Sequence, residues 1–193
     1  GRLDRTFEAQ RSLSLLFSFY IEPKRGKEDR GFIPLIAGAV VANSINKVTN
    51  SNKYSCKWPN DILVEKKKIA GILSEIFSKG VIIGIGINVT MSEADLPTPS
   101  ASSIYLQSQV ILDRNYLLAE FCNEFKKVFE DWDRGEDLTN YYSSLSATLK
   151  KKVKIIQTGS EITGFAEKVS VTGALILASG EEVTVGDLVH LKE

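Results

Sequence analysis

The chain has 193 residues, 43% of them hydrophobic and 25% charged, which excludes wholesale disorder and predicts one large domain or a main domain with a small appendage. Because 24 basic residues balance 24 acidic ones, the net charge gives no electrostatic basis for binding nucleic acid or an acidic membrane. Two cysteines and one histidine exclude a disulfide framework and a zinc site of usual spacing. No uninterrupted apolar run approaches the roughly 18 residues that span a bilayer and no signal peptide is visible, so we expect a soluble, cytoplasmic protein. The chain opens on Gly1 without a methionine, and we expect it to be part of a longer protein.

The first 150 residues predict strands and helices around a common core. Continuous apolar runs indicate buried strands, and apolar side chains at steps of three and four residues indicate helices. The expected strands are 13–21 and 81–89, the expected helices 33–48, 114–134 and 138–149, and the expected loops 24–30 and 91–103. Asp113 is the expected N-cap of the strongest helix, whose apolar stripe includes Cys122 and Trp132. Both residues are therefore expected in the core.

The composition changes at Lys150-Lys151-Lys152. Short alternating segments separated by glycines follow, a pattern that predicts a small β-barrel of about 40 residues. Its expected strands are 153–156, 161–168, 174–177, 182–185 and 189–191. We accordingly expect one domain over residues 1–150 and a second over 151–193.

The segment Lys57 to Glu75, KWPNDILVEKKKIAGILSE, predicts a hairpin that carries polar side chains. A two-residue turn at Lys66-Lys67 would pair Asp61 with Ile72 and would place Asp61, Leu63, Glu65, Lys68, Ala70 and Ile72 on one face. Asp61 and Lys68 would then lie ~13 Å apart, at about 3.3 Å per residue. That distance is too long for an ion pair but suits an extended ligand, which Gly71 would let approach the backbone.

Spacing alone leaves a simpler interpretation open, in which the three lysines form a solvated hairpin tip and Pro59-Asn60-Asp61 is only a turn. Lys-Lys is also poor chemistry for the type I′ turns that two-residue hairpins favour.

Three motifs in chain order carry a resemblance to a known family. KWPND, then KIAG at Lys68 to Gly71, then GIGIN at Gly84 to Asn88, resemble the biotin–protein ligases. GRLDRTF at Gly1 to Phe7 looks like the second half of the family's GRGR-containing loop. LDRN before the long helix and GFAEKVSVTGALIL near the C-terminus continue the likeness over essentially the whole chain.

The resemblance implies an α/β (α+β) fold, with a mixed, largely antiparallel sheet flanked by helices, as in class II synthetases and biotin/lipoate ligases. It also implies that 151–193 form an SH3-like barrel. The implied activity joins biotin to ATP as biotinyl-5′-AMP and transfers biotin to a lysine of a biotin carboxyl carrier protein. The implied cofactors are ATP and Mg²⁺, biotin is the substrate, and a carboxylase carrier domain is the partner. A homodimer stays open, and no nucleic acid or membrane partner is implied.

Carried over residue by residue, the resemblance assigns catalytic roles to Lys68, Asp61 and Arg2, with Asp61 also the candidate ligand of Mg²⁺. It assigns contacts with biotin or ATP to Gly1, Arg2, Arg5, Phe7, Asn60, Lys68, Gly71, Leu73, Gly84, Gly86 and Asn88. An ammonium, arginine forks and a carboxylate are the groups that bind phosphate, carboxylate and a hard cation. The loop departs from the family at Leu3 and Asp4, where small or basic residues are usual.

Two other functions remain open on the residues. A lipoate–protein ligase shares the fold and handles a bulkier acid, although KWPND followed by KIAG favours biotin. A binding module that holds biotin or a carrier protein without turnover is the other. The sequence contains no G-x-x-x-x-G-K-[ST] P-loop, and GIGIN lacks the third glycine and the following helix of a dinucleotide fingerprint.

Overall fold

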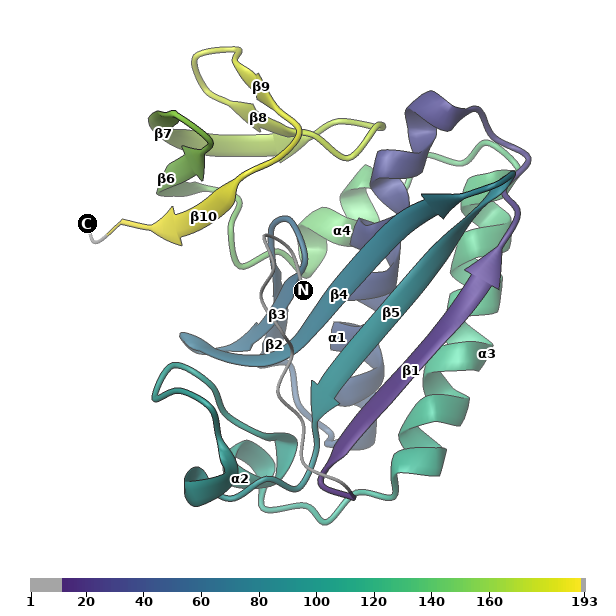
Figure 1. The fold of residues 1–193 in the computed structure, drawn as a ribbon, viewed down its shortest axis with the longest axis vertical. Coiled ribbons are helices and arrows are strands. Elements are labelled where there is room, and N and C mark those ends of the chain that lie inside the picture. The colour runs from purple at the N-terminus through teal and green to yellow at the C-terminus, as the bar shows by residue number, and fades with distance from the viewer. Residues whose placement is uncertain (1–11, 192–193) are drawn as a thin grey trace.

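The computed structural model describes residues 12–191, which form two antiparallel sheets with helices packed against the first (Figure 1). The larger sheet has the strand order β1-β5-β4-β3-β2 and the smaller has the order β10-β6-β7-β8-β9. The strands are β1 (Ser14–Ile21), β2 (Tyr54–Lys57), β3 (Asp61–Val64), β4 (Lys67–Phe77), β5 (Gly80–Asn88), β6 (Lys151–Gln157), β7 (Ser160–Val169), β8 (Leu175–Leu177), β9 (Glu182–Val183) and β10 (Asp187–His190). The helices are η2 (Lys27–Phe32), α1 (Ile33–Val48), η3 (Glu93–Asp95), α2 (Ile104–Ser108), α3 (Arg114–Asp133) and α4 (Thr139–Ser144). All ladders between these strands are antiparallel, and isolated parallel bridges join Ser146 to Cys56 of β2 and Ala101 to Lys68 of β4. The larger sheet is therefore largely antiparallel, as expected.

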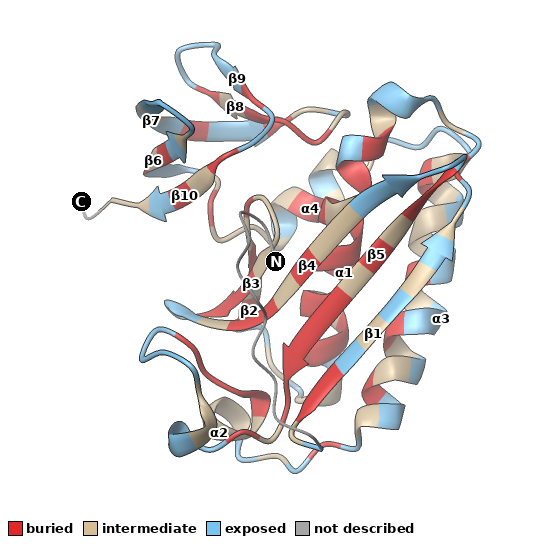
Figure 2. Cartoon of the chain, viewed as in Figure 1, coloured by how far each residue is buried: buried red, intermediate tan, exposed pale blue. Residues whose placement is uncertain are grey.

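Helix α1 covers one face of the larger sheet and is apolar on almost every side. Twelve of its sixteen residues are buried, because it packs against β2, β3 and β4 on one side and α3 on another (Figure 2). Lys27–Val48, which includes η2, is long and apolar enough to cross a membrane, but 72% of its most apolar window is buried inside the protein. Burial of that extent is typical of a core helix.

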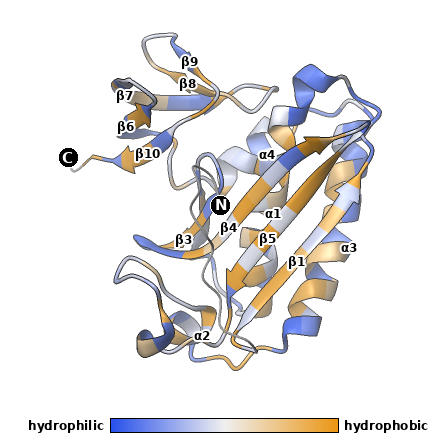
Figure 3. Cartoon of the chain, in the orientation of Figure 1, coloured by the Kyte–Doolittle hydropathy of each residue, from blue (hydrophilic) through white to orange (hydrophobic). Residues whose placement is uncertain are grey.

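Helix α3 packs on the same side of the sheet, behind β1. Its N-terminus is capped as expected, since the Asp113 side chain accepts a hydrogen bond from the backbone N–H of Asn115. Phe121 and Phe125 contact Phe17 and Phe19 of β1 edge to face or at a tilt, with ring centroids 4.9–5.8 Å apart. Figure 3 shows hydrophobic residues along β1, β4, β5 and the helices behind them. The apolar periodicity of the sequence therefore identified most of the core-facing residues of α3, among them Leu117, Phe121, Phe125 and Trp132.

The placement of Cys122 was predicted wrongly. Trp132 is buried as expected, but the Cys122 side chain is exposed, at the rim of an aromatic groove of about 510 Å³ between β1 and α3. Neighbouring residues of an α-helix point to different sides of it. Phe121 points toward the sheet and is buried, so the side chain of Cys122 points to another side of α3 and is exposed.

Several boundaries in the connecting segments also differ from expectation. The helix expected over 138–149 ends at Ser144, because residues 145–147 turn to pair with β2. The charged loop 24–30 contains the start of η2, and the loop 91–103 contains η3 and leads into the short helix α2. These short turns carry too few apolar residues to leave a periodic signal.

The C-terminal residues form a five-stranded antiparallel sheet near the segments predicted for them, and β9 and β10 both end earlier than expected. Val153 and Ile155 of β6 point inward and are fully buried with Ala166, Leu175 and Leu177. Gly173 and Gly180 make the tight turns between strands with φ of 89° and 86°.

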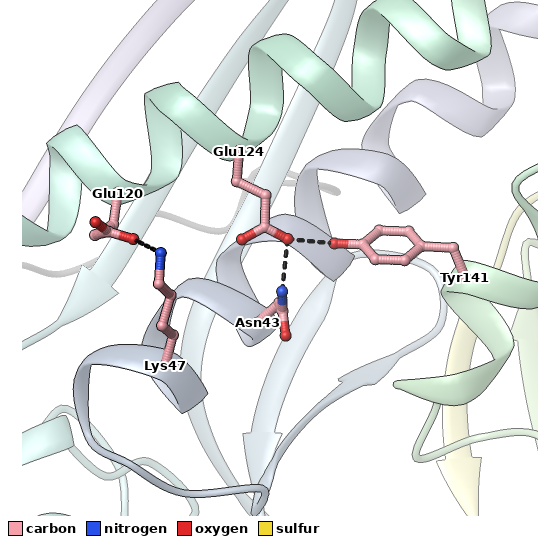
Figure 4. Close-up of polar contacts among 5 residues, drawn as sticks. All are labelled: Asn43, Lys47, Glu120, Glu124 and Tyr141. Atoms are coloured by element: carbon pink, nitrogen blue, oxygen red, sulfur yellow. Dashed lines mark hydrogen bonds and ion pairs between the residues drawn. The ribbon is translucent and has the colours of Figure 1, made fainter.

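A polar cluster joins the helices α1, α3 and α4 (Figure 4). Glu124 of α3 accepts hydrogen bonds from Asn43 Nδ2 of α1 at 2.6 Å and from Tyr141 Oη of α4 at 2.7 Å. Lys47 and Glu120 form an ion pair one turn along the same helices. Burial raises the pKa of the Tyr141 hydroxyl and the bond to Glu124 raises it further, so Tyr141 remains a protonated donor. One carboxylate thus satisfies two partly buried donors from different helices.

Replacing Glu124 is expected to destabilise the protein. Glu124→Ala would leave Asn43 and Tyr141 without their acceptor and lower the free energy of unfolding by about 1–3 kcal/mol. Urea unfolding of the full-length protein measures this change. Glu130→Ala, an exposed position on the same helix, is the control and should stay within about 0.5 kcal/mol of wild type. Equal effects of the two substitutions would show that the cluster does not hold the helices together.

Candidate active site

The hairpin β3–β4 brings Lys68 and Asp61 into direct contact. Lys68 Nζ lies 2.6 Å from Asp61 Oδ1, whereas the sequence predicted a separation of ~13 Å. The expected register is wrong, because the turn is formed by Glu65 and Lys66, with φ of 55° at Glu65. Lys67 then pairs with Val64. Lys68 lies opposite Leu63, only two residues along the strand from Asp61.

A β-bulge completes the difference. The pairing shifts between Ile62 and Leu63, and Ile69 is the extra residue on β4, so Asp61 lies opposite Gly71 rather than Ile72. Ala70 and Ile72, which were expected beside Asp61, are instead buried on the α1 side of the sheet. Their apolar side chains decide the register, because a slip of one residue would expose them and bury the polar face.

The face of the sheet turned away from α1 carries the predicted ligand-contacting residues that fall on β4 and β5. Gly71 pairs directly with Gly86, and Leu73 pairs directly with Gly84. Residues opposite each other point to the same side of a sheet, so these four positions form one strip beside Asp61 and Lys68. We call Gly71, Leu73, Gly84 and Gly86 the glycine strip. Three of its four members lack a side chain, which leaves backbone that a flat ligand can approach closely.

Lys68 reaches over the strip from one end. Its Cε and Nζ atoms lie 3.3 Å from where a Cβ of Gly71 would be, and Asp61 Oδ1 lies 3.8 Å from that point. The Lys68 side chain is 40% exposed and that of Asp61 is 20% exposed. The ammonium is therefore held in place by one carboxylate and still faces solvent above the strip.

Residues 100–102, which lie in the segment expected to be a loop, fix the backbone of Lys68. Lys68 N–H donates to Ser100 O at 2.8 Å, and Ser102 N–H donates to Lys68 O at 2.8 Å, so residues 100–102 extend the sheet where β5 has ended. The Ser-rich composition of this segment gave no sign of the pairing. Its position depends on a contact across more than 30 residues, which no local pattern encodes.

Asn60 and Asn88 occupy different environments at the two ends of the site. Asn60 is bound to β4 by two hydrogen bonds. Its side-chain Nδ2 donates to Ile72 O at 2.9 Å, and its backbone carbonyl accepts from Ile72 N–H at 2.8 Å. Asn88 is buried, and its Nδ2 donates to Ser102 O at 2.9 Å. Its Oδ1 has no partner among residues 12–191, which makes it an acceptor available to a donor from a ligand or another segment. Gly1, Arg2, Arg5 and Phe7 lie outside the described residues.

Asp61 fits a magnesium ion in one limited way. No three His, Cys, Asp or Glu side chains converge anywhere in the described part of the chain, so these residues do not build a cage for a metal. Mg²⁺ in phosphate-transfer sites is commonly held by one or two carboxylates together with substrate phosphates and water. A single carboxylate already paired with Lys68 is compatible only with that mode.

The chain is similar in sequence to proteins of one known family. A model of the biotin/lipoate A/B protein ligase family matches residues 1–91. The chain is 30% identical to the biotin–[acetyl-CoA-carboxylase] ligase of Mycobacterium tuberculosis over 84% of this chain and 63% of the relative. It is 31% identical to the bifunctional ligase/repressor BirA of Escherichia coli over 92% of this chain and 57% of the relative. The chain thus spans about three fifths of the length of these curated relatives.

Solved structures show the same fold. The biotin protein ligase of Aquifex aeolicus in complex with biotin and ATP superposes with a TM-score of 0.85 and 26% sequence identity, over 100% of this chain and 84% of that chain. A second structure of the Aquifex aeolicus enzyme superposes with a TM-score of 0.80. The motifs, these relatives and the solved structures agree that the chain is similar to the biotin–protein ligases over most of its length.

Proposed function

We propose that the protein containing this chain is an ATP-dependent ligase, which forms biotinyl-5′-AMP and then transfers biotin to a lysine of a biotin carboxyl carrier protein. One observation carries the proposal: a half-exposed ammonium, Lys68, is anchored by Asp61 over the glycine strip, three of whose four residues lack a side chain. The names of the relatives, and the complex of one of them with biotin and ATP, support it.

The chemistry requires positioning and charge neutralisation more than a protein nucleophile. In the first step an oxygen of the biotin carboxylate attacks the α-phosphorus of ATP and pyrophosphate leaves. In the second step the carrier lysine amine attacks the acyl carbon and AMP leaves. Lys68 would stabilise the negative charge on the carboxylate and the α-phosphoryl oxygens, and Asp61 would keep the ammonium in place.

The remaining site residues fit binding roles in this scheme. The glycine strip would receive the flat parts of the ligands, with Leu73 as an apolar contact. The unpaired Oδ1 of Asn88 is an acceptor that matches the exocyclic amino group of adenine. When bound, Mg²⁺ would supply charge to the phosphates of ATP, with Asp61 as its candidate protein ligand. Arg2 and Arg5 would add phosphate contacts from outside the described residues.

We also propose a domain organisation for the chain and a cellular location for the protein. Residues 1–150 would form most of a catalytic domain and residues 151–193 an SH3-like barrel. The protein would act in the cytoplasm, where the carboxylase carrier domain is its partner.

Pyrophosphate release by the full-length protein tests the proposal. With ATP and Mg²⁺ present, biotin should stimulate release of pyrophosphate and produce biotinyl-5′-AMP, and lipoate should not. Stimulation by lipoate alone would identify a lipoate ligase. Saturable biotin binding without pyrophosphate release would identify a binding module, and either result would overturn the assignment.

A further inference from the structure

Trp58, the aromatic residue of the KWPND motif, is hydrogen-bonded to the C-terminal sheet. Its side chain is 1% exposed, and its indole Nε1–H donates a hydrogen bond to Gly173 O at 3.1 Å. Gly173 lies in the turn between β7 and β8 of the C-terminal sheet. A hydrogen bond between residues 115 positions apart in the sequence therefore links the KWPND motif to the smaller sheet.

The turn that carries Gly173 packs directly on the backbone of the larger domain. A Cβ on Gly173 would lie 2.3 Å from Gly31 O, and a Cβ on Gly31 would lie 2.4 Å from Thr172 O. Real Cβ atoms do not approach backbone so closely, so the contact exists only because both residues are glycines. Gly31 is an exposed residue of η2, directly before α1, so the turn contacts the backbone of the segment that leads into the core helix.

A second connection reaches Trp58 through the segment that precedes β6. Trp58 N–H donates to Thr148 Oγ1 at 3.0 Å, and Thr148 Oγ1 lies 3.2 Å from His190 Nε2 of β10. Thr148 is fully buried. Burial, with the positive charges of Lys151 and Lys57, lowers the pKa of His190 to about 4, so the imidazole at this junction is neutral.

On its other side, Trp58 is two residues from the ligand site. Pro59 lies between Trp58 and Asn60, and its ring restricts the backbone φ angle at that position. Asn60 is held to Ile72 of β4 by two hydrogen bonds, and Asp61 pairs with Lys68. A displacement of the indole would therefore move Asn60 and Asp61 against β4, because the chain between them has little freedom.

We propose that Trp58 is a positioning residue, through which docking of the C-terminal sheet at Gly173 sets the geometry of Asn60, Asp61 and Lys68. The C-terminal sheet then contributes to adenylate formation without touching the reacting atoms. The catalytic part of this inference rests on the proposed function. The mechanical part, the coupling of Gly173 to the β3–β4 hairpin, does not.

Two glycine substitutions separate docking from simple backbone strain. Gly173 and Gly180 have φ of 89° and 86°, but a Cβ on Gly180 meets nothing within 4 Å. Gly173→Ala and Gly180→Ala thus impose similar local strain, and only the first clashes with Gly31. In the full-length protein, Gly173→Ala should lower kcat for biotin-dependent pyrophosphate release by about tenfold, and Gly180→Ala should change it less than about twofold.

Trp58→Phe provides the second variant, since it keeps a buried aromatic ring and removes the indole donor together with the pyrrole part of the ring system. If Trp58 acts through Lys68, Trp58→Phe should reduce kcat in wild type and have little further effect in a Lys68→Ala background. Multiplying effects in the double variant would indicate a merely structural role and would overturn the inference.

Hydrogen exchange gives a readout that does not depend on activity. The Ile72 amide, which donates to Asn60 O, should exchange faster in Gly173→Ala than in Gly180→Ala. Equal exchange rates in the two variants would overturn the coupling. Faster exchange in Gly173→Ala, with no biotin-dependent pyrophosphate release from wild type, would instead support the coupling and count against the proposed function.

Discussion

Lys68→Ala is expected to reduce biotinyl-5′-AMP formation by the full-length protein about 10²- to 10³-fold. Removing a preorganised charge from developing negative charge typically costs several kcal/mol of transition-state stabilisation. Lys68 is held 2.6 Å from Asp61 above the glycine strip, so the ammonium is already in position before ligands bind. Because charge on the phosphoryl group grows toward the transition state, the loss should fall mainly on kcat.

Lys67→Ala is the matched control for this substitution. Lys67 is the preceding residue of β4 and is exposed, and it pairs with Val64 at the hairpin end. Its removal should leave adenylate formation within about twofold of wild type. Partly exposed ion pairs contribute little to folding, so Lys68→Ala should unfold at nearly the wild-type temperature. Near-normal biotinyl-5′-AMP formation by a folded Lys68→Ala protein would remove Lys68 from the mechanism.

Gly84→Ala is expected to lower kcat/KM for pyrophosphate release by about tenfold to a hundredfold. A Cβ at Gly84 would have its nearest protein neighbour, Ser18 Oγ, at 3.4 Å, so the fold itself has room for the methyl group. A ligand lying flat on the strip would not, and an overpacked contact of that kind costs about 1–3 kcal/mol. Because the methyl group obstructs the ground state and the transition state alike, the change should appear mainly in KM.

A double variant decides whether the ligand or the protein meets the added methyl group. Ser18 lies directly opposite Gly84 on β1, and Ser18→Ala would remove the nearer of the two described atoms within 4 Å, leaving Leu73 O at 4.0 Å. If the loss of activity comes from the ligand, Ser18→Ala/Gly84→Ala should stay as impaired as Gly84→Ala alone. Recovery of wild-type kcat/KM in the double variant would mean that the strip is not where the ligand lies.

Together these variants probe the two ends of one surface. Lys68 would stabilise charge on the reacting groups, and the absence of a side chain at Gly84 would leave room for the bound ligand. The residues of Gly1 to Phe7 lie outside the described residues, and the proposal that Arg2 and Arg5 contact phosphate can be tested by the same pyrophosphate assay.

Local sequence determined the larger helices and strands, and its motifs gave the prediction for the site residues. The apolar runs of β1 and β5 and the periodic stripes of α1 and α3 were predicted close to their observed bounds, because each element buries its own face and carries that requirement in its own residues. The order of KWPND, KIAG and GIGIN resembles that of the biotin–protein ligases, and this resemblance predicts Lys68, Asp61 and the three glycines of the strip as site residues.

The tertiary structure alone decided how those residues meet. The register of the β3–β4 hairpin depends on which side chains α1 buries, and the predicted turn was therefore one residue out of place and missed the bulge at Ile69. The pairing of Lys68 with residues 100–102, and the bond from Trp58 to Gly173, join segments 30 to 115 residues apart. Such contacts are selected by packing of the whole chain, so motifs in the local sequence could predict the site's residues but not their distances from one another.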